Sequence, residues 1–345
     1  MRTEPLHILL TWPMPDDAMR LIAQADSRVR VAKAAYVEPE ARRDLRRKRQ
    51  VAELAQQPFP IPQDFLEQAR TAEVMYGLDF PTDLPKLAPK LKWVQLIGAG
   101  ADHLPGGSGI LESGIVVTSM GGFSSRNIAE YVLNAMLSHV KLSKAFVLAQ
   151  PKKEWKRLGG DTLHGKTVGI VGLGRIGGFV AQFAKAFDMR VLACRRSPDA
   201  KAPQHADAVF SPERLSQMLP QCDFVVIATA LTPETRGLIG EKALRAMKTS
   251  ALLINVARGE VVDEPALIRA LREGWIAAAH LDVFQHEPLP PENPLWDMPN
   301  VTITPHSSAV MPGFAQEGVK VFIEQIRRYL AGEPLRYVVD RQKGY

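Results

Sequence analysis

Three charged side chains have the types and spacing needed for proton transfer on a polar substrate: Arg258, Glu287 and His306. A histidine exchanges protons near neutral pH, and an arginine stabilises negative charge that develops on a substrate oxygen. A carboxylate beside a histidine favours its charged form, and Glu287 is the candidate for that role. Together they predict reduction of a carbonyl group by hydride transfer, with His306 as acid or base and Arg258 anchoring the substrate carboxylate and carbonyl. Taken singly, each could instead be structural or belong to a surface ion pair.

A glycine-rich loop provides a candidate cofactor site. A strand-like apolar run over 168–171 precedes it and a helical pattern follows it. The G-x-G-x-x-G spacing in this context is typical of dinucleotide-binding loops, in which the glycines allow a tight turn, close approach of a pyrophosphate and close packing of the helix. The positive end of the helix then faces the phosphates. The predicted cofactor-binding residues here are Gly172, Leu173, Gly174, Arg175, Ile176 and Gly177.

The end of the next strand indicates which dinucleotide is bound. Enzymes that use NAD usually carry a carboxylate roughly 20 residues beyond the loop, where it binds the ribose. Here the sequence reads Arg195, Arg196 and Ser197 instead. Because arginine forms charge-assisted bonds with phosphate, we predict that these residues bind the 2′-phosphate of NADP(H), with NAD(H) as the alternative. The competing interpretation is that both arginines point to solvent.

The elements that must position these residues form two sets of short β-rich runs, separated by helical patterns. The first set covers residues 6–11, 29–32, 74–76, 93–97 and 115–119. The second, more apolar set covers residues 168–171, 191–194, 224–229, 252–256, 278–283 and 301–304. Continuous apolar strands of this kind indicate parallel sheets covered by helices on both faces. Ligands bind at the carboxyl ends of such strands, so Thr229 and Ala257 are also predicted to contact the cofactor.

A helical pattern over 127–149, with Asn127 and Glu130 at capping-box spacing, links the two sets. The last helical segment, about 313–330, is predicted to pack back on the first set. The predicted fold is therefore α/β, with two doubly wound parallel-sheet domains and a cleft between them. A discontinuous, flavodoxin-like substrate-binding domain would cover residues 1–118 and 308–345, and a Rossmann-type dinucleotide-binding domain would cover residues 119–307.

Composition narrows the class further. The chain is 46% hydrophobic and 23% charged, as in globular proteins, and no stretch approaches the roughly 18 apolar residues of a membrane span. The net charge of +6 and the basic run over 42–49 could indicate nucleic-acid binding. Such a run is usually a solvated helix face, however, and no aromatic residues are interleaved with it. Alternatively, the positive charge could steer anionic substrates and cofactor toward the protein. Cys194 and Cys222 lack the spacing of metal sites or disulfides, so we expect no metal and a cytoplasmic location.

Three strings resemble the D-isomer-specific 2-hydroxyacid dehydrogenase family: residues 255–259 (NVARG), 281–288 (LDVFQHEP) and 304–306 (TPH). By that resemblance, Arg258, Glu287 and His306 match the catalytic triad, and Asp282 matches a residue near the nicotinamide. The loop containing Gly98, Ala99 and Gly100 is similar to the family's substrate loop, whose amides hold the substrate carboxylate. The resemblance implies reduction of a 2-keto acid to a 2-hydroxy acid by a homodimer.

Arg195, in place of an acidic residue, and the Ser307-Ser308-Ala309 sequence after His306 are similar to the glyoxylate/hydroxypyruvate reductase branch. A different class is a dinucleotide-sensing, corepressor-like binding protein, since the family includes corepressors with this fold. The absence of the acidic residue that usually binds the ribose of NAD(H), at the position of Arg195, argues against an NADH sensor. A third interpretation is another hydride donor such as formate or phosphite, but a formate enzyme of the family would pair its histidine with glutamine, so Glu287 argues against it.

Overall fold

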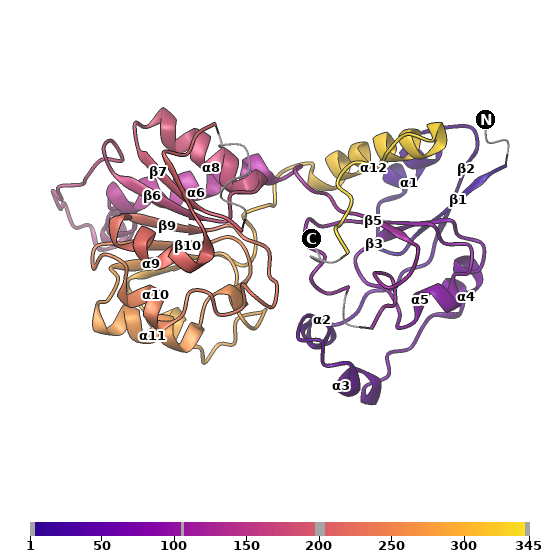
Figure 1. Cartoon of the computed structure of the whole chain (residues 1–345), viewed down its shortest axis with the longest axis horizontal. Coiled ribbons are helices and arrows are strands. Elements are labelled where there is room, and N and C mark those ends of the chain that lie inside the picture. Colours follow the sequence, from indigo (N-terminus) through magenta and orange to yellow (C-terminus); the bar gives the residue numbers. More distant parts are fainter. Residues whose placement is uncertain (1–3, 105–106, 197–203, 342–345) are drawn as a thin grey trace. The chain divides into compact units, whose positions relative to one another are not determined.

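The computed structural model describes residues 4–104, 107–196 and 204–341, which form two compact units (Figure 1). Unit 1 comprises Met1–Phe123 and Met311–Tyr345, and unit 2 comprises Ser124–Val310. Each unit is built on a parallel sheet, which confirms the predicted pair of parallel α/β sheets. Ser197, one of the predicted cofactor-binding residues, lies outside the described residues.

Unit 1 has a five-stranded parallel sheet in the order β2-β1-β3-β4-β5. The strands are β1 (Leu6–Leu10), β2 (Val29–Lys33), β3 (Val74–Gly77), β4 (Trp93–Leu96) and β5 (Val116–Thr118). The helices are α1 (Asp16–Ala23), α2 (Glu40–Arg47), α3 (Val51–Gln56), α4 (Gln63–Ala69), α5 (Leu84–Leu87) and α12 (Phe314–Ala331). Successive side chains of β1 point into two hydrophobic cores, one on each face of the sheet. Ile8 belongs to the core with α1 and α12, and Leu9 belongs to the core with α4 and α5. The predicted packing of the last helix on the first sheet is therefore confirmed.

Most of the basic run lies in helix α2, whose four arginines are held in ion pairs rather than presented as a solvated face, so that expectation is wrong for the helix. Arg46, 3% exposed, donates from Nε and Nη2 to the two oxygens of Glu38, which is 2% exposed, at 2.6 and 2.7 Å. Arg43 binds Asp79 in the same two-point manner, with both contacts at 2.8 Å. Burial acts to raise the pKa of Glu38, but the Arg46 guanidinium holds it below its ordinary value.

Unit 2 has a seven-stranded parallel sheet in the order β12-β11-β10-β9-β6-β7-β8. The strands are β6 (Thr167–Val171), β7 (Arg190–Cys194), β8 (Ala208–Phe210), β9 (Phe224–Ile227), β10 (Leu252–Asn255), β11 (Ala278–Leu281) and β12 (Val301–Ile303). The helices are α6 (Ser125–Val140), α7 (Ser143–Ala149), α8 (Arg175–Ala186), α9 (Leu215–Met218), α10 (Glu241–Arg245) and α11 (Glu264–Glu273). One core packs α6 and α8 against the sheet, and the other packs α9, α10 and α11 against its opposite face.

The predicted single helix over 127–149 is wrong, because it is broken between α6 and α7. The backbone amide of Asp161 donates to the carbonyl of Val140 (2.7 Å), which satisfies a carbonyl that would otherwise continue the helix. The predicted capping box is wrong too, since Asn127 lies inside the first turn of α6 and its amide donates to the carbonyl of Ser308 (3.0 Å). Among the described residues, no single helix is long and apolar enough to cross a membrane; only α6 taken with Ser143–Lys152, bent by 66°, has the length and composition.

Candidate active site

The carboxyl edge of the unit 2 sheet places the predicted catalytic residues on loops after three neighbouring strands. Arg258 follows β10, Glu287 follows β11, and His306 follows β12. Asn255 pairs with Leu281, and Leu281 pairs with Ile303, so the three strands end at the same level. The loops therefore start side by side, as expected for a site at the carboxyl edge of a parallel sheet.

His306 and Glu287 are in direct contact. His306 Nδ1 lies 2.7 Å from Glu287 Oε2, and the other carboxylate oxygen accepts the backbone N–H of Phe284 at 3.0 Å. The carboxylate is thus fixed at both oxygens. Because Nδ1 is used by Glu287, Nε2 is the ring nitrogen that can exchange a proton with a substrate, and the side chain of His306 is 45% exposed.

Arg258 lies on a short turn that Asn255 stabilises. The side-chain amide of Asn255 donates to the carbonyl of Arg258 (3.0 Å), and its oxygen accepts the N–H of Ala257 (3.1 Å). A Cβ atom at Gly259 would lie 1.9 Å from the carbonyl carbon of Phe284, so only glycine lets this turn pack on the loop that leads to Glu287. The NVARG string therefore encodes both the turn and its contact with the neighbouring loop.

Asp282, predicted to lie near the cofactor, has partners of its own in the structure. It is fully buried, and its carboxylate accepts the backbone N–H groups of Ser307 (2.9 Å) and Ser308 (3.0 Å) and the hydroxyl of Thr304 (2.6 Å). Its carbonyl accepts the N–H of His306 at 2.8 Å. Asp282 is therefore tied to the turn that carries the histidine, a role the sequence analysis missed.

The phosphate loop has the geometry that its glycines require. Gly172 has φ +103°, and a Cβ there would lie 2.6 Å from the amide nitrogen of Thr229. A Cβ at Gly177 would lie 2.2 Å from the carbonyl oxygen of Gly172. Gly174 faces open space at the start of α8, whose first turn carries no acidic residue. Space for a ligand beside an uncapped helix N-terminus fits a pyrophosphate.

Other predicted cofactor residues lie within the 172–177 segment or after the next strand, β7. Leu173 and Ile176 are partly buried against the core that contains α8. Arg195 and Arg196 follow β7, where the N–H of Arg195 donates to the carbonyl of Phe210 in β8 (3.0 Å). Arg195 is half-buried and Arg196 is exposed. The two residues that directly follow β7 are thus basic, whereas an acidic residue, Glu213, follows the neighbouring strand β8.

The predicted substrate loop belongs to unit 1. Gly98, Ala99 and Gly100 follow β4, where the carbonyl of Gly98 accepts the N–H of Met120 (2.9 Å) and Ala99 is exposed. Within unit 2, Glu287 and His306 are in contact and Arg258 lies on the loop after the neighbouring strand β10, where its Nη1 donates to the carbonyl of Ala257 (2.8 Å).

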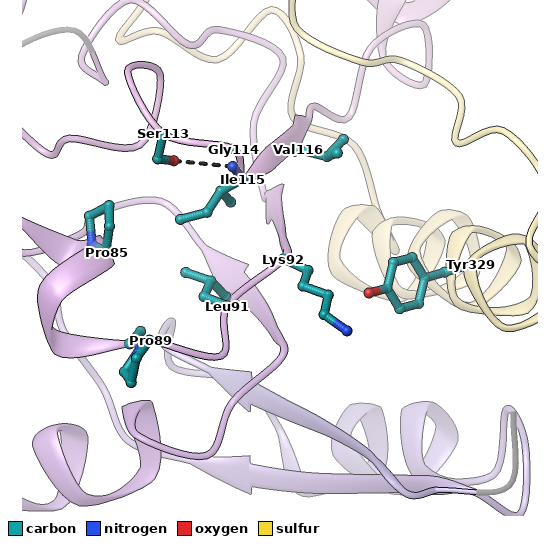
Figure 2. Close-up of a pocket in the computed structure, with 10 residues that line it drawn as sticks. Pro85, Pro89, Leu91, Lys92, Ser113, Gly114, Ile115, Val116 and Tyr329 are labelled. Atoms are coloured by element: carbon teal, nitrogen blue, oxygen red, sulfur yellow. Dashed lines mark hydrogen bonds between the residues drawn. The ribbon is translucent and has the colours of Figure 1, made fainter.

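A pocket of about 490 Å³ in unit 1 involves none of the predicted residues (Figure 2). It lies at the amino ends of β4 and β5, the sheet edge opposite the substrate loop. Lys92 and Tyr329 reach its rim, and both contact Glu73: the tyrosine hydroxyl donates at 2.7 Å, and the ammonium lies 3.5 Å away. In the described parts of the chain, no group of three or more His, Cys, Asp or Glu side chains could hold a metal ion.

The chain resembles known proteins over most of its length. The family model described as D-isomer specific 2-hydroxyacid dehydrogenase, NAD binding domain, matches residues 133–308, within unit 2. D-3-phosphoglycerate dehydrogenase of Methanocaldococcus jannaschii is 35% identical over 286 residues, covering 81% of this chain and 53% of that protein; the chain thus spans about half the length of this relative. Glyoxylate reductase of Pyrococcus horikoshii is 38% identical over 270 residues, covering 74% and 78%.

Solved structures of similar proteins extend over nearly the whole chain. A D-isomer specific 2-hydroxyacid dehydrogenase from Xanthobacter autotrophicus Py2, in complex with NADPH and MES, has a TM-score of 0.79 and 30% identity, and covers 99% of this chain and 100% of that one. The NADPH-dependent glyoxylate/hydroxypyruvate reductase from Sinorhizobium meliloti, in complex with NADP and sulfate, has a TM-score of 0.76 and 26% identity, with coverage of 99% and 100%.

Proposed function

Since this chain belongs to the D-isomer-specific 2-hydroxyacid dehydrogenase family, we propose that it reduces a 2-keto acid of the glyoxylate and hydroxypyruvate type to the 2-hydroxy acid, with NADP(H) as cofactor. The observation that carries the proposal is the 2.7 Å contact between His306 Nδ1 and Glu287 Oε2. It supplies an acid–base group at the edge of the sheet where ligands bind. The names of the glyoxylate reductases among its relatives support the substrate class.

The side chains divide the chemistry between them. When bound, the nicotinamide supplies the hydride that adds to the carbonyl carbon of the substrate. Arg258 binds the substrate carboxylate and carbonyl through charge-assisted hydrogen bonds and stabilises the negative charge that develops on oxygen. His306 donates a proton from Nε2 to that oxygen, which completes the alcohol, while Glu287 stabilises the imidazolium. In the reverse direction, neutral His306 accepts the hydroxyl proton.

The cofactor is proposed to lie along the edge formed by β6, β7 and β9. Its pyrophosphate would rest on the amides of the loop from Gly172 to Gly177, which have the space and the helix start that it needs. Arg195 and Arg196 would bind the 2′-phosphate of NADP(H). The alternative cofactor is NAD(H), which has no 2′-phosphate and would not make this contact. The NADPH bound to the Xanthobacter relative supports this preference. Thr229, Ala257 and Asp282 complete the proposed cofactor-binding set, together with Ser197.

Arg258 and His306 of unit 2 are proposed to bind the substrate, and the backbone amides of Ala99 and Gly100 of unit 1 are proposed as further donors to its carboxylate. A small 2-keto acid presents a carboxylate, for which backbone amides and a guanidinium are suitable donors.

The assembly is proposed to be a homodimer formed through unit 2. All of residues 151–162 are exposed, and Trp155 is 93% exposed. The side chains of Phe146, Val147, Leu148 and Leu158 are also exposed, and together with Trp155 they are here called the 146–158 patch. Large apolar side chains exposed at this frequency in one short segment are typical of protein interfaces. A cytoplasmic location is also proposed, because Cys194 and Cys222 are buried and outside any disulfide.

Initial rates with glyoxylate, hydroxypyruvate, pyruvate and phenylpyruvate, each with NADPH and NADH, test the proposal. We expect turnover of glyoxylate and hydroxypyruvate, with a lower KM for NADPH than for NADH. Binding of NADPH without turnover of any 2-keto acid would contradict it and favour a dinucleotide-sensing binding protein instead.

A further inference from the structure

The turn that carries His306 has a backbone conformation that needs support from its surroundings. His306 has φ +50°, in the left-handed region that residues with a Cβ rarely adopt. Such conformations persist where neighbouring groups hold them in place, and they are common at active sites. The groups that hold this turn therefore determine where the imidazole lies.

Asp282 holds the turn on both sides of the histidine. Its carbonyl accepts the N–H of His306, and its carboxylate accepts the N–H groups of the next two residues, Ser307 and Ser308. Three consecutive amides are thus bound by a single fully buried residue. The position of the Asp282 side chain therefore sets the position of the histidine turn.

A chain of hydroxyl groups in turn fixes the Asp282 carboxylate. A carboxylate only accepts hydrogen bonds, so the hydroxyl of Thr304, 2.6 Å from Asp282 Oδ1, must donate its single hydrogen there. Thr304 Oγ1 also contacts the hydroxyl of Tyr131, and Tyr131 must then be the donor in that contact. Burial raises the pKa of Tyr131 to about 12, so the phenol keeps its proton across the neutral range.

Tyr131 is itself held in place. Its ring meets the ring of His280 edge-on, with 5.2 Å between centroids and an 89° angle between planes. Burial lowers the pKa of His280 to about 4, so this neighbour is uncharged near neutral pH. Asn127, one turn earlier on the same face of α6, donates to the carbonyl of Ser308 (3.0 Å). Helix α6 thus supports the histidine turn at two points.

We propose that Tyr131 is a positioning residue for the reaction, which acts through Thr304 and Asp282 to hold the His306 imidazole against Glu287. The expected effect of Tyr131 on turnover rests on the proposed function, whereas the hydrogen-bond chain exists in the protein without substrate or cofactor. Tyr131 is therefore expected to influence the proton-transfer step and to leave the affinity for substrate and cofactor unchanged.

The test compares variants that remove one link at a time. Tyr131→Phe removes only the hydroxyl, Thr304→Val removes the donor and the acceptor with little change of shape, and Thr304→Ser restores both. We expect Tyr131→Phe to lower kcat roughly three- to tenfold, as for loss of one buried hydrogen bond, with KM values unchanged. Thr304→Val should lower kcat further, Thr304→Ser should recover it, and the double variant Tyr131→Phe/Thr304→Val should be no slower than Thr304→Val alone.

Tyr329→Phe is the matched control, because the hydroxyl of Tyr329 makes a comparable 2.7 Å hydrogen bond to Glu73 in unit 1. Its kcat should equal that of the wild type. Hydrogen exchange of the Ser307 and Ser308 amides gives a second readout without turnover, and it should be faster in Tyr131→Phe and Thr304→Val. Unchanged exchange and unchanged kcat in Tyr131→Phe would overturn the positioning role. Wild-type protein that reduces no 2-keto acid would overturn the proposed function, and the exchange rates would still decide the hydrogen-bond chain.

Discussion

His306 Nδ1 lies 2.7 Å from Glu287 Oε2, and this contact joins loops that follow adjacent strands, β12 and β11. Nineteen residues separate the two along the chain. The pair forms because the parallel strands end together and the Phe284 N–H fixes the carboxylate. Because the contact occupies Nδ1, it orients the ring and leaves Nε2 for proton transfer to a substrate.

Replacing His306 by glutamine removes the proton donor and keeps a polar side chain of similar size. We expect His306→Gln to lower kcat by roughly 100- to 10,000-fold, the usual contribution of general acid catalysis, with little change in the Kd of NADPH. Glu287→Gln should cost less, because a neutral amide still orients the ring. Initial rates and cofactor fluorescence titration measure both effects. Glu292→Gln, at an exposed position five residues further on, is the control, and full activity of His306→Gln would refute the assignment.

The two arginines after β7 should determine the choice of cofactor. We expect Arg195→Ala/Arg196→Ala to raise the KM for NADPH by roughly 10- to 100-fold, since hydrogen bonds to charged groups are lost, and to leave the KM for NADH nearly unchanged. Arg190→Ala, at the exposed amino end of the same strand, controls for the loss of positive charge. An equal loss for both cofactors would show that these arginines bind no 2′-phosphate.

The strands of the two sheets, and the loops that follow β10, β11 and β12, could be predicted from the sequence because both depend on local patterns. Apolar runs mark buried strands, and the carboxyl ends of those strands place Arg258 and His306. Strand β8 (Ala208–Phe210) went unpredicted because its apolar run, AVF, has only 3 residues, which is too short to distinguish a strand from a loop. The break after Val140 went unpredicted because Leu142 adopts a left-handed conformation (φ +56°) with no glycine to mark it, and the amide of Asp161 that binds the Val140 carbonyl lies 21 residues away.

The side-chain partners were harder to predict than the backbone. The run over 42–49 shows its charge in the sequence, but the partner Asp79 lies 36 residues from Arg43 and comes from the loop after β3. Similarly, the sequence around Tyr131 indicates only an aromatic residue in an amphipathic helix. Its partner Thr304 is 173 residues away, and no local pattern connects the two.

The stability of unit 2 should fall in mild acid because of His280. Burial lowers the pKa of His280 from 6.5 to about 4, so the unfolded chain binds a proton between these pH values that the folded chain does not. The stabilising contribution is complete above pH 6.5 and is lost as the pH falls toward 4. We expect a loss of about 2 kcal/mol from this group between pH 7 and pH 5. Urea denaturation of the wild type and His280→Phe at both pH values measures it, and the two proteins should differ in their pH dependence by this amount. Identical pH dependence would exclude a buried, neutral His280.

The ion pairs of α2 should stabilise unit 1. Arg46→Met leaves the Glu38 carboxylate buried without its main partner, and we expect a loss of about 3–5 kcal/mol in the free energy of unfolding. Arg49→Ala, at an exposed position in the same basic run, should change it by less than about 0.5 kcal/mol. Denaturant titration followed by circular dichroism measures both. Equal, small effects would mean that the run is a solvated surface after all.

The 146–158 patch should hold two copies of the chain together. Residues 151–162 are exposed throughout, so in the described chain this segment gains little from burial against its own unit. An apolar side chain such as Trp155, 93% exposed, gains free energy when a second copy removes it from water. We expect Val147→Glu/Trp155→Glu to raise the dimer Kd at least about 30-fold, because charge is placed in an apolar interface. Light scattering after size-exclusion chromatography measures the mass. Trp296→Glu, at an exposed tryptophan outside the patch, should leave a dimer intact, and a wild type that runs as a monomer at micromolar concentration would contradict the assembly.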